Sequence, residues 1–455
     1  MRTLVKLALA SETPLENLLL KGWVRTRRDS KKFSFLELND GTCLKNIQCI
    51  ADAGIPGYEN ITKMTTGAAI GIKGKLIPSE GKNQKWEVLA TEIELIGESP
   101  EDFPLQKKGH TPEFMRSIAH LRPRANLYGA VFRMRSRMAN AVHRFFNERH
   151  FTYVHTPIIT SSDCEGAGEM FRVSTLDATA TKPQNYDNDF FGKPAYLTVS
   201  GQLEGETFAT ALSNIYTFGP TFRAENSNTS RHACEFWMIE PEMAFCDLEG
   251  DMDLAEAFVK YLVEDTLNNN EGDLDIFNQF IDKKLIERLE FVATKPFNRI
   301  SYTEAISILE KSGKVFNYPV EWGINLQSEH ERYLTEDYFK CPTTVYNYPK
   351  DVKPFYMRLN EDNKTVTAMD VLVPGIGEIV GGAQREERLD VLQANMKQHQ
   401  LSEKDYWWYL ELRKYGSCPH AGFGMGFERM LMFATGMKNI RDVIPFTRTP
   451  GSCDF

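Results

Sequence analysis

The chain has 455 residues, of which 42% are hydrophobic and 25% are charged, and its formal net charge is -9 at pH 7. This length exceeds a single ordinary hydrophobic core, so we expect at least two domains. The composition is that of a globular protein, and no stretch approaches the roughly 20 consecutive apolar residues of a membrane helix, which argues against any membrane role.

The negative charge argues against a protein coated in nucleic acid, but it is unevenly distributed. Residues 1–100 carry a net charge of +2, and the remainder carries -11. A polyanion partner is therefore expected to bind locally, at the N-terminal segment. The apolar run near the N-terminus is interrupted by Lys6 and lacks a clear cleavage site, which predicts a cytoplasmic protein. The eight cysteines form no CxxC pair and are expected to be reduced.

The segment from Gly22 to about Ile96 contains short β-type runs separated by turn signals. The runs are GWVRTRR, FSFLELNDG, NIQCIA, AIGIKGKLI and WEVLATEIELI. Their alternation and spacing predict a small closed or half-closed β-barrel. Breaker residues then cluster in a stretch typical of a connection between domains, at Pro100, Pro104, Gly109 and Pro112.

Residues 127–149 predict a long amphipathic helix. Apolar residues recur there at a spacing of three to four, at Leu127, Val131, Met134, Met138, Val142 and Phe145. The extended run YVHTPIIT follows the helix. Because Pro157 limits ladder pairing, we expect this run at a sheet edge or an interface.

The remainder of the chain contains further strand-like runs and a mainly helical insert at about residues 247–345. The runs are PAYLTVS, NIYTFGPTFRAE, EFWMIEPEMAF and TAMDVLVPGIGEIVGG. Strands joined by long irregular segments, with helices clustered apart, predict an antiparallel sheet in an α+β domain. We therefore predict an α+β protein with a barrel domain at 1–102, a linker at 103–120 and a larger domain at 121–455.

The first candidate site is the FRAE sequence that ends at Glu225, followed by the polar loop NSNTSRHAC and then Phe236. A strand, a loop and a returning strand would hold Arg223 and Glu225 on the sheet and let Arg231 and His232 reach from the loop. Arginine forks bind phosphate oxygens in a bidentate manner, so two arginines around one aromatic side chain indicate a nucleotide site. Taken alone, FRxE fits a surface ion pair equally well.

The second candidate site is the sequence GFGMGFER, which runs from Gly422 to Arg429 and precedes a helix-like MLMFATG. Glycines let a strand approach a flat ligand closely, and Arg429 at the start of the helix could stack on a purine. A lone glycine run is also typical of a packing device or a tight turn.

Together, FRxE with its loop and the later GxGxGxERxxM and RDVIPFxR resemble motifs 2 and 3 of class II aminoacyl-tRNA synthetases. The helix at 127–149 with Tyr153 to Pro157 resembles motif 1, which forms the dimer interface in that class. The resemblance covers nearly the whole chain. It implies a class II antiparallel sheet flanked by helices, ATP and tRNA as substrates, Mg²⁺ as cofactor, and a homodimer through residues 127–157.

The N-terminal barrel resembles the OB-type anticodon-binding domain of the subgroup for aspartate, asparagine and lysine. In that subgroup an aromatic residue stacks on the central anticodon base and a glutamine reads it, and Phe35 and Gln48 stand at the matching positions. Such stacking is worth about 1–3 kcal/mol per base, and Arg25, Arg27 and Arg28 would add contacts to the tRNA backbone. Without Gln48, Phe35 would fit a barrel-core aromatic as well.

The sequence TVSGQLEGE resembles the asparagine-specific members of this subgroup. Aspartate-specific members typically have SPQLxKQ, whose lysine pairs with the substrate carboxylate, and Gly205 stands where that lysine would be. The sequence GEIVGGAQREE also resembles the asparagine-specific members. By this match, Arg385 donates a hydrogen bond to the side-chain carbonyl oxygen of the substrate. The resemblance thus implies activation of asparagine as its adenylate and transfer to the 3' end of a tRNA.

Glu240 falls where aspartate-specific enzymes carry an aspartate, and the resemblance places it near the side-chain end of the substrate. A neutral amide offers both a donor and an acceptor, so an arginine and a glutamate together suit it. Aspartate would bring a second carboxylate near Glu240 at a cost of several kcal/mol. By the same match, Glu165 and Gln202 lie near the substrate ammonium, although Glu165 alone fits a solvated loop charge.

The resemblance also assigns the nucleotide-binding residues. Arg223 would bridge the amino-acid carboxylate and the α-phosphate, and Phe236 and Arg429 would sandwich the adenine. Arg231 and His232 would hold the outer phosphates. Glu378 is the expected Mg²⁺ ligand, with Glu225 as a helper, because Mg²⁺ needs only one or two carboxylates besides phosphates and water. No covalent nucleophile is needed, so positioning and charge neutralisation carry the catalysis.

Three alternatives remain open at this point. The chain could be an aspartate-specific enzyme, which Gly205 and the RTPGSCDF terminus argue against. It could be an ammonia-dependent asparagine synthetase on the same fold, although such an enzyme needs no anticodon domain. It could also be a silent paralogue, although paralogues of that kind tend to lose the arginines that bind ATP.

Overall fold

The computed structural model describes residues 1–455 except 82–83, 107, 165–168, 178–184, 228 and 271. These residues form two compact units, one comprising 1–133 with 271–276 and the other 134–270 with 277–455. Within the described part of the chain, every helix is too short or too polar to span a bilayer. All eight cysteines are free thiols, as the sequence predicts.

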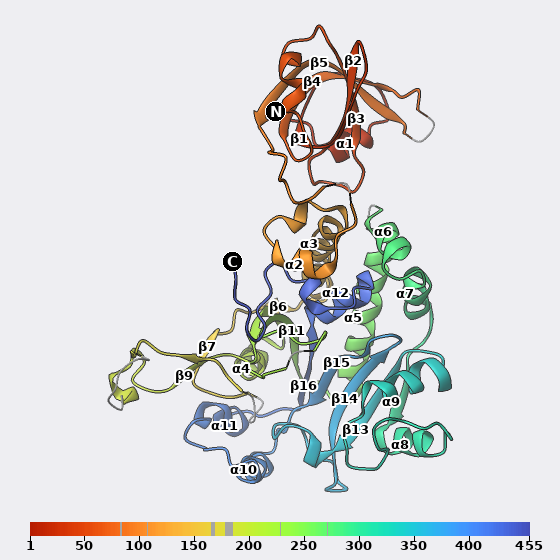
Figure 1. The fold of residues 1–455 in the computed structure, drawn as a ribbon. Helices are drawn as coiled ribbons and strands as arrows, with labels where there is room; N and C mark the ends of the chain where they lie inside the picture. Colours follow the sequence, from red (N-terminus) through yellow and green to blue (C-terminus); the bar gives the residue numbers. More distant parts are fainter. Residues whose placement is uncertain (82–83, 107, 165–168, 178–184, 228, 271) are drawn as a thin grey trace. The chain divides into compact units, whose positions relative to one another are not determined.

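The first unit is built on a closed β-barrel with the strand order β1-β2-β3-β5-β4 (Figure 1). Its strands are β1 (Leu15–Asp29), β2 (Phe33–Asn39), β3 (Ile47–Asp52), β4 (Ala69–Pro78) and β5 (Trp86–Gly97). The barrel that the sequence predicts is therefore confirmed. Alternate side chains such as Leu36, Leu38 and Val88 are fully buried inside it, because successive residues of a strand point to opposite faces.

Short helices accompany the barrel. They are α1 (Val5–Leu9), η1 (Tyr58–Lys63), α2 (Pro112–Ser117) and η2 (Arg122–Arg124). The long helix α3 (Asn126–Asn147) confirms the predicted amphipathic helix. Of the six apolar residues that define its stripe, five are buried and Leu127 is half-buried.

The second unit contains an eight-stranded sheet with the order β12-β13-β14-β15-β16-β11-β10-β6. Its strands are β6 (Thr152–Tyr153), β10 (Asn214–Phe222), β11 (Glu235–Ala244), β12 (Asn298–Ser301), β13 (Thr343–Pro349), β14 (Thr365–Val373), β15 (Gly377–Gln384) and β16 (His420–Gly426). The interior pairs are antiparallel, as predicted, but the two edge pairs, β12 with β13 and β6 with β10, are parallel. β6 lies at the edge, where Pro157 nearby led us to expect it.

Helices accompany this sheet in the chain (Figure 1). They are α4 (Gln202–Leu212), α5 (Leu248–Asn268), α6 (Asp273–Phe280), α7 (Leu285–Thr294), α8 (Tyr302–Glu310), α9 (Ser328–Arg332), the π-helical turn Tyr333–Tyr338, α10 (Leu389–Gln398), α11 (Trp407–Lys414) and α12 (Phe427–Thr435). Several of them pack on the sheet, among them α4, α5, α8 and α12. α5 begins where the Asp247 carboxylate caps the Gly250 N–H at 3.0 Å. It packs on β14, β15 and β16. The first helix of the predicted insert therefore packs directly against the main sheet.

A small three-stranded sheet with the order β7-β9-β8 extends from the second unit. Its strands are β7 (Ile159–Thr160), β8 (Arg172–Val173) and β9 (Ala195–Leu197). The run PAYLTVS thus forms a strand as expected, but it pairs outside the main sheet. Short 3-10 turns complete the unit at Tyr186–Asn188, Lys350–Val352 and Ile440–Asp442.

The turn before η1 provides a test of the barrel. Gly57 has φ +88°, and a Cβ built on it would lie 1.7 Å from the carbonyl oxygen of Ile93. Gly41 has φ +83°, but a Cβ there meets nothing within 4 Å. We expect Gly57→Ala to destabilise the barrel by more than the roughly 1 kcal/mol of backbone strain that Gly41→Ala introduces. Faster hydrogen exchange of the β4 and β5 amides in Gly57→Ala than in Gly41→Ala would confirm this, and equal exchange in both variants would contradict it.

Candidate active site

Strand β11 supplies one wall of two adjoining cavities in the second unit. Phe236, Met238, Glu240 and Glu242 lie two residues apart, so their side chains point to the same face of the sheet. Phe236 lines the first cavity, the two glutamates line the second, and Met238 lines both. The cavities also share Arg223, which joins them at the end of the preceding strand.

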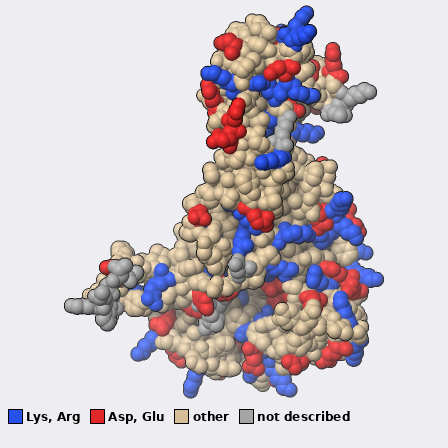
Figure 2. Space-filling view, viewed as in Figure 1, with Lys and Arg blue, Asp and Glu red and all other residues tan. Residues whose placement is uncertain are grey.

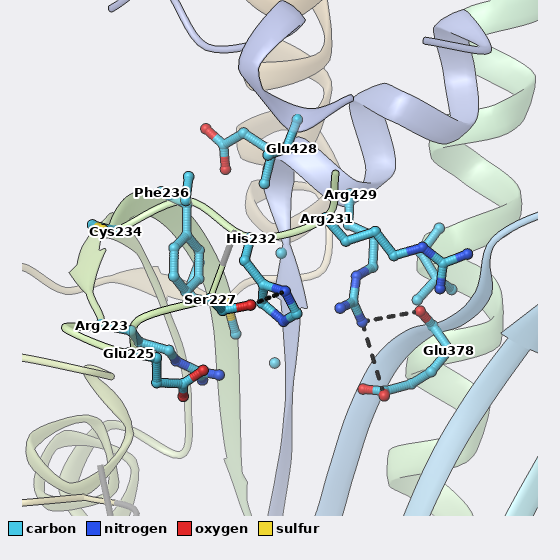
Figure 3. Close-up of a pocket in the computed structure, with 16 residues that line it drawn as sticks. Arg223, Glu225, Ser227, Arg231, His232, Cys234, Phe236, Glu378, Glu428 and Arg429 are labelled. Atoms are coloured by element: carbon cyan, nitrogen blue, oxygen red, sulfur yellow. Dashed lines mark hydrogen bonds and ion pairs between the residues drawn. The ribbon is translucent and has the colours of Figure 1, made fainter. Parts of the chain in front are cut away.

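The first cavity contains every residue that we expected to bind ATP (Figure 3). Its lining includes Arg223, Glu225, Arg231, His232, Phe236, Glu378 and Arg429. The guanidinium carbon of Arg223 lies 5.5 Å from the centre of the Phe236 ring, and on the other side Arg429 Nη1 donates to the Glu378 carbonyl at 3.2 Å. Guanidinium groups beside an aromatic face can hold a flat ligand together with its phosphates.

The loop between β10 and β11 is tied to the wall of this cavity. Arg231 Nη1 donates to Ser328 Oγ at 2.7 Å, at the start of α9. Ser227 Oγ lies 3.1 Å from His232 Nδ1. Burial, together with the nearby arginines, lowers the pKa of His232, so its ring is neutral at pH 7. In the tautomer in which Nδ1 accepts from this hydroxyl, Nε2 carries the proton and is a hydrogen-bond donor.

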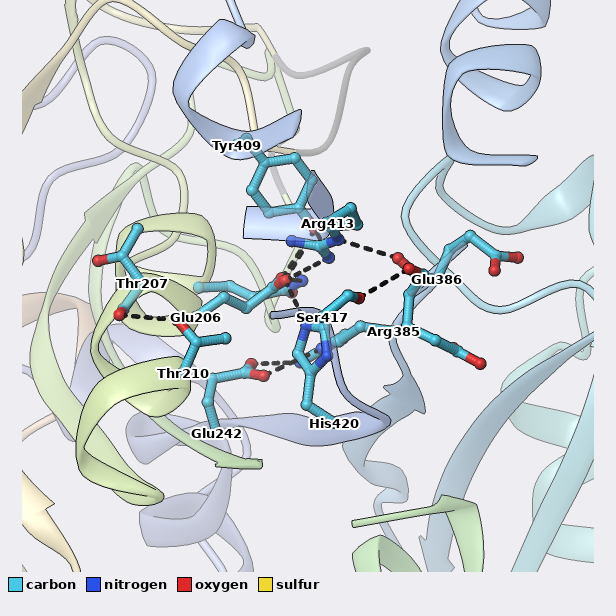
Figure 4. Close-up of polar contacts among 12 residues, drawn as sticks. Glu206, Thr207, Thr210, Glu242, Arg385, Glu386, Tyr409, Arg413, Ser417 and His420 are labelled. Carbon is cyan, nitrogen blue, oxygen red and sulfur yellow. Dashed lines mark hydrogen bonds and ion pairs between the residues drawn. The ribbon is translucent and has the colours of Figure 1, made fainter. Parts of the chain in front are cut away.

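The second cavity is built around a buried ion pair between Arg385 and Glu242 (Figure 4). Nε and Nη2 of Arg385 both donate to the carboxylate of Glu242, the first at 3.1 Å. The Arg385 side chain is 3% exposed and that of Glu242 is 1% exposed. Gly422 leaves room for this pair, because a Cβ there would lie 2.6 Å from a carboxylate oxygen of Glu242.

Glu240, which we expected to act with Arg385, lines the same cavity but has other partners. Its carboxylate accepts hydrogen bonds from Ser200 Oγ, from the Gly201 N–H at 3.0 Å and from Thr217 Oγ1 at 3.0 Å. The carboxylate that pairs with Arg385 is thus Glu242, which sequence reasoning missed. The period of two along β11 is the signal that could have found it.

Gln202 also lines the second cavity, at the first turn of α4. Its amide nitrogen donates to Glu206 at 3.0 Å, and Glu206 also binds Tyr409, Arg413 and His420 (Figure 4). Sequence analysis identified none of these four residues. Glu165 lies outside the described residues, whereas its neighbour Cys164 lines the cavity.

The barrel presents Phe35 and Gln48 together on its outer face. Phe35 is half-buried, opposite Ile50 in the register, and Gln48 is two residues before Ile50. The two side chains are therefore diagonal neighbours on one face of the β2–β3 pair. This rules out the barrel-core interpretation of Phe35. Gln48 Nε2 lies 3.3 Å from Glu87.

The three arginines of β1 differ in their surroundings. Arg25 donates to the Arg124 carbonyl and Arg27 to the Ile61 carbonyl, the latter at 2.6 Å. Arg28 is exposed and lies directly opposite Phe35 in the register. Lys and Arg are interspersed with Asp and Glu on the visible face of the barrel (Figure 2). The side chains of Arg28, Phe35 and Gln48 thus lie on the same outer face of the three neighbouring strands β1, β2 and β3.

Comparison with known proteins identifies the family. Residues 112–450 match the model of "tRNA synthetases class II (D, K and N)", and residues 18–96 match that of the "OB-fold nucleic acid binding domain". The chain belongs to the class II tRNA synthetases of the D, K and N family. The family match covers the whole sheet of the second unit, and the OB-fold match covers most of the barrel.

Relatives within this family resemble the chain over its full length. It is 62% identical to an asparagine–tRNA ligase of Nitratidesulfovibrio vulgaris and 59% identical to one of Microcystis aeruginosa, with 100% of each chain covered. Among solved structures of this synthetase family, the asparaginyl-tRNA synthetase of Pyrococcus horikoshii complexed with asparaginyl-adenylate has a TM-score of 0.87. It is 31% identical and covers 100% of this chain and 99% of its own.

A buried carboxyl group beside the first cavity generates a pH prediction. Burial, reinforced by the carboxylates of Glu378 and Asp370, raises the pKa of Glu331 from 4.5 to about 7. Between these values the folded state binds more protons than the unfolded state, so this group lowers the free energy of unfolding as pH rises from about 4.5 to 7.

Glu331→Gln should remove this penalty while keeping an acceptor for the Glu378 N–H, which lies 3.1 Å from Glu331. We expect the variant to be more stable than the wild type above pH 7, by at most about 3 kcal/mol, and equally stable near pH 4.5. Denaturant unfolding at several pH values measures the difference. A difference that does not depend on pH would contradict the prediction.

Proposed function

We propose that this chain is an asparagine–tRNA ligase. It uses ATP to activate asparagine as asparaginyl-adenylate and transfers the asparaginyl group to the 3' end of the asparagine tRNA during protein synthesis. The observation that carries the proposal is the pair of adjoining cavities on β11, one with the arginines and aromatic of a nucleotide site and one with the Arg385–Glu242 pair. Full-length identity of about 60% to asparagine–tRNA ligases supports it.

The nucleotide occupies the first cavity. Phe236 and Arg429 hold the adenine between them, and Arg231 and the neutral His232 bind the outer phosphates. Arg223 lines both cavities, so its guanidinium lies where the substrate carboxylate meets the α-phosphate. The carboxylate attacks the α-phosphorus and pyrophosphate leaves. The protein contributes mainly by positioning the two substrates and neutralising charge.

Mg²⁺ would be held by Glu378, with Glu225 nearby. Within the described residues there is no cluster of three or more metal-binding side chains, but Mg²⁺ binds through one or two carboxylates together with phosphates and water. The Glu378 side chain is 41% exposed and lines the first cavity, which fits this mode of binding. When bound, the ion neutralises phosphate charge.

Asparagine occupies the second cavity, with its side-chain carbonyl oxygen at Arg385. Nε and one N–H of Nη2 of Arg385 are bound to Glu242, so a ligand meets the two N–H groups of Nη1 and the second N–H of Nη2. These donors can bind the carbonyl oxygen of an amide. Because Glu242 already balances the charge of Arg385 and Glu240 adds negative charge, aspartate gains less here than an unpaired arginine would give it. Gln202 and Glu165 bind the α-ammonium group of asparagine.

The barrel binds the anticodon. Phe35 stacks on a base, Gln48 reads it, and Arg25 and Arg27 contribute positive charge, with the exposed Arg28 beside Phe35. We assign residues 1–102 to this domain, 103–120 to the linker and 121–455 to the catalytic domain with its insert at about 247–345. The barrel family match at 18–96 lies within the first domain, and the synthetase match at 112–450 begins inside the linker and covers most of the catalytic domain.

The enzyme works as a homodimer in the cytoplasm, joined through residues 127–157. Tyr153 and the neighbouring Ile158 and Trp237 are partly exposed around this segment, and apolar surface of this kind is typical of subunit interfaces.

Amino-acid-dependent exchange of pyrophosphate into ATP tests the proposed function. We expect exchange with asparagine and little with aspartate or the other standard amino acids. Arg223→Ala should lower kcat by about a hundredfold or more, because one preorganised charge at the reacting phosphate is lost. Robust exchange with aspartate alone, or unchanged exchange in Arg223→Ala, would contradict the proposal. Formation of asparagine from aspartate and ammonium without tRNA would indicate the synthetase alternative.

A lysine at position 205 tests the origin of the amino-acid choice. A Cβ on Gly205 would lie 3.7 Å from Cγ of Glu242, with no contact closer than 3.4 Å. A lysine there can pair with Glu242 and release the Arg385 fork. We expect Gly205→Lys to raise the ratio of aspartate to asparagine activation by about tenfold or more. The control Gly205→Met adds similar bulk without charge and should weaken asparagine without helping aspartate. Equal aspartate-to-asparagine ratios in the two variants would contradict the proposal that charge at this position sets the choice of amino acid.

A further inference from the structure

The carboxylate of Glu206 lies fully buried beneath the second cavity and receives hydrogen bonds from four side chains (Figure 4). The donors are Gln202 Nε2 at 3.0 Å, Tyr409 Oη at 2.9 Å, Arg413 Nη2 at 2.6 Å and His420 Nε2 at 2.9 Å. A carboxylate offers about four lone-pair positions, so these donors saturate it.

The surroundings keep Glu206 ionised. Burial alone would raise the pKa of Glu206, but the Arg413 guanidinium and the His420 ring together hold it below its usual value. His420 Nδ1 lies 2.9 Å from the Cys418 carbonyl oxygen while Nε2 faces Glu206. The Nε2 proton of this ring points at the Glu206 carboxylate. Glu206 is therefore an acceptor only.

An acceptor-only neighbour decides which way the Gln202 amide points. Its NH₂ group must face Glu206, because its carbonyl oxygen would meet another oxygen there. The carbonyl oxygen of Gln202 is left for the cavity that this residue lines. A positively charged ammonium group of a ligand would meet an acceptor, and the opposite orientation would present it with N–H donors.

We propose that Glu206 is a positioning residue that fixes the Gln202 amide with its carbonyl oxygen toward the α-ammonium group of asparagine. The inference rests on the proposed function, in which asparagine occupies the second cavity. Tyr409, Arg413 and His420 serve this role indirectly, by supplying the donors that keep Glu206 an acceptor. The buried charges under the cavity thus select for an amino acid over the corresponding simple acid.

The test is Glu206→Gln. The new amide has one oxygen, which the Arg413 guanidinium attracts, so its NH₂ group turns toward Gln202. Gln202 then rotates its oxygen away from the cavity and presents NH₂ to the substrate ammonium. We expect the KM for asparagine in pyrophosphate exchange to rise by roughly ten- to a hundredfold, as for loss of a hydrogen bond to a charged group, with the KM for ATP unchanged.

Succinamic acid, which is asparagine without its α-amino group, distinguishes loss of the ammonium contact from a general loss of binding in the second cavity. Its inhibition constant should be the same in Glu206→Gln and in the wild type, because it has no ammonium to contact Gln202. The control Glu204→Gln, on the same helix but outside this network, should leave both constants unchanged. Equal weakening of asparagine and succinamic acid in Glu206→Gln, or no weakening of asparagine, would overturn the inference.

A second variant covers the case in which Glu206→Gln does not fold. Gln202→Met keeps the volume and the other three donors to Glu206, and it should lose the preference for asparagine over succinamic acid. A wild-type preference in Gln202→Met would overturn the inference. Absence of exchange with asparagine in the wild type would instead overturn the proposed function on which it rests.

Discussion

The pairing of buried charges under the second cavity is the constraint on which the active site depends. Arg385, Glu242, Glu206 and Arg413 are almost completely removed from water, and each ion buried in this way costs several kcal/mol unless it is paired. The pairs are therefore held in fixed geometries by their own partners. They join β11, the residue after β15, α4 and α11, so the same contacts that stabilise the fold also shape the cavity.

This arrangement has a chemical consequence for recognition. The charge of Arg385 is balanced by its pairing with Glu242, and the carboxylate of Glu240 opposes a further negative charge. In the proposed function, selectivity for a neutral amide follows from this balance of charge. The same logic extends to Gln202, whose orientation is set by a saturated carboxylate.

The alternation of side chains along β11 links the two halves of the reaction. Residues two apart place the aromatic of the nucleotide site and the carboxylates of the amino-acid site along one line. Arg223 stands at the junction because it follows β10, which pairs with β11 along its whole length. Adjacency of the reacting groups is thus a property of strand register, which supports catalysis by positioning.

The sequence by itself determined the barrel, the long helix α3 and the residues around the first cavity, because each depends on local periodicity or on a short motif. Phe35 and Gln48 were also predictable as a pair. The tertiary structure alone decided that Glu242 pairs with Arg385 and that Tyr409, Arg413 and His420 surround Glu206. These partners lie up to 214 residues apart on different elements, and single buried charges leave no periodic signal. Only the packing that removes them from water shows which charges must meet.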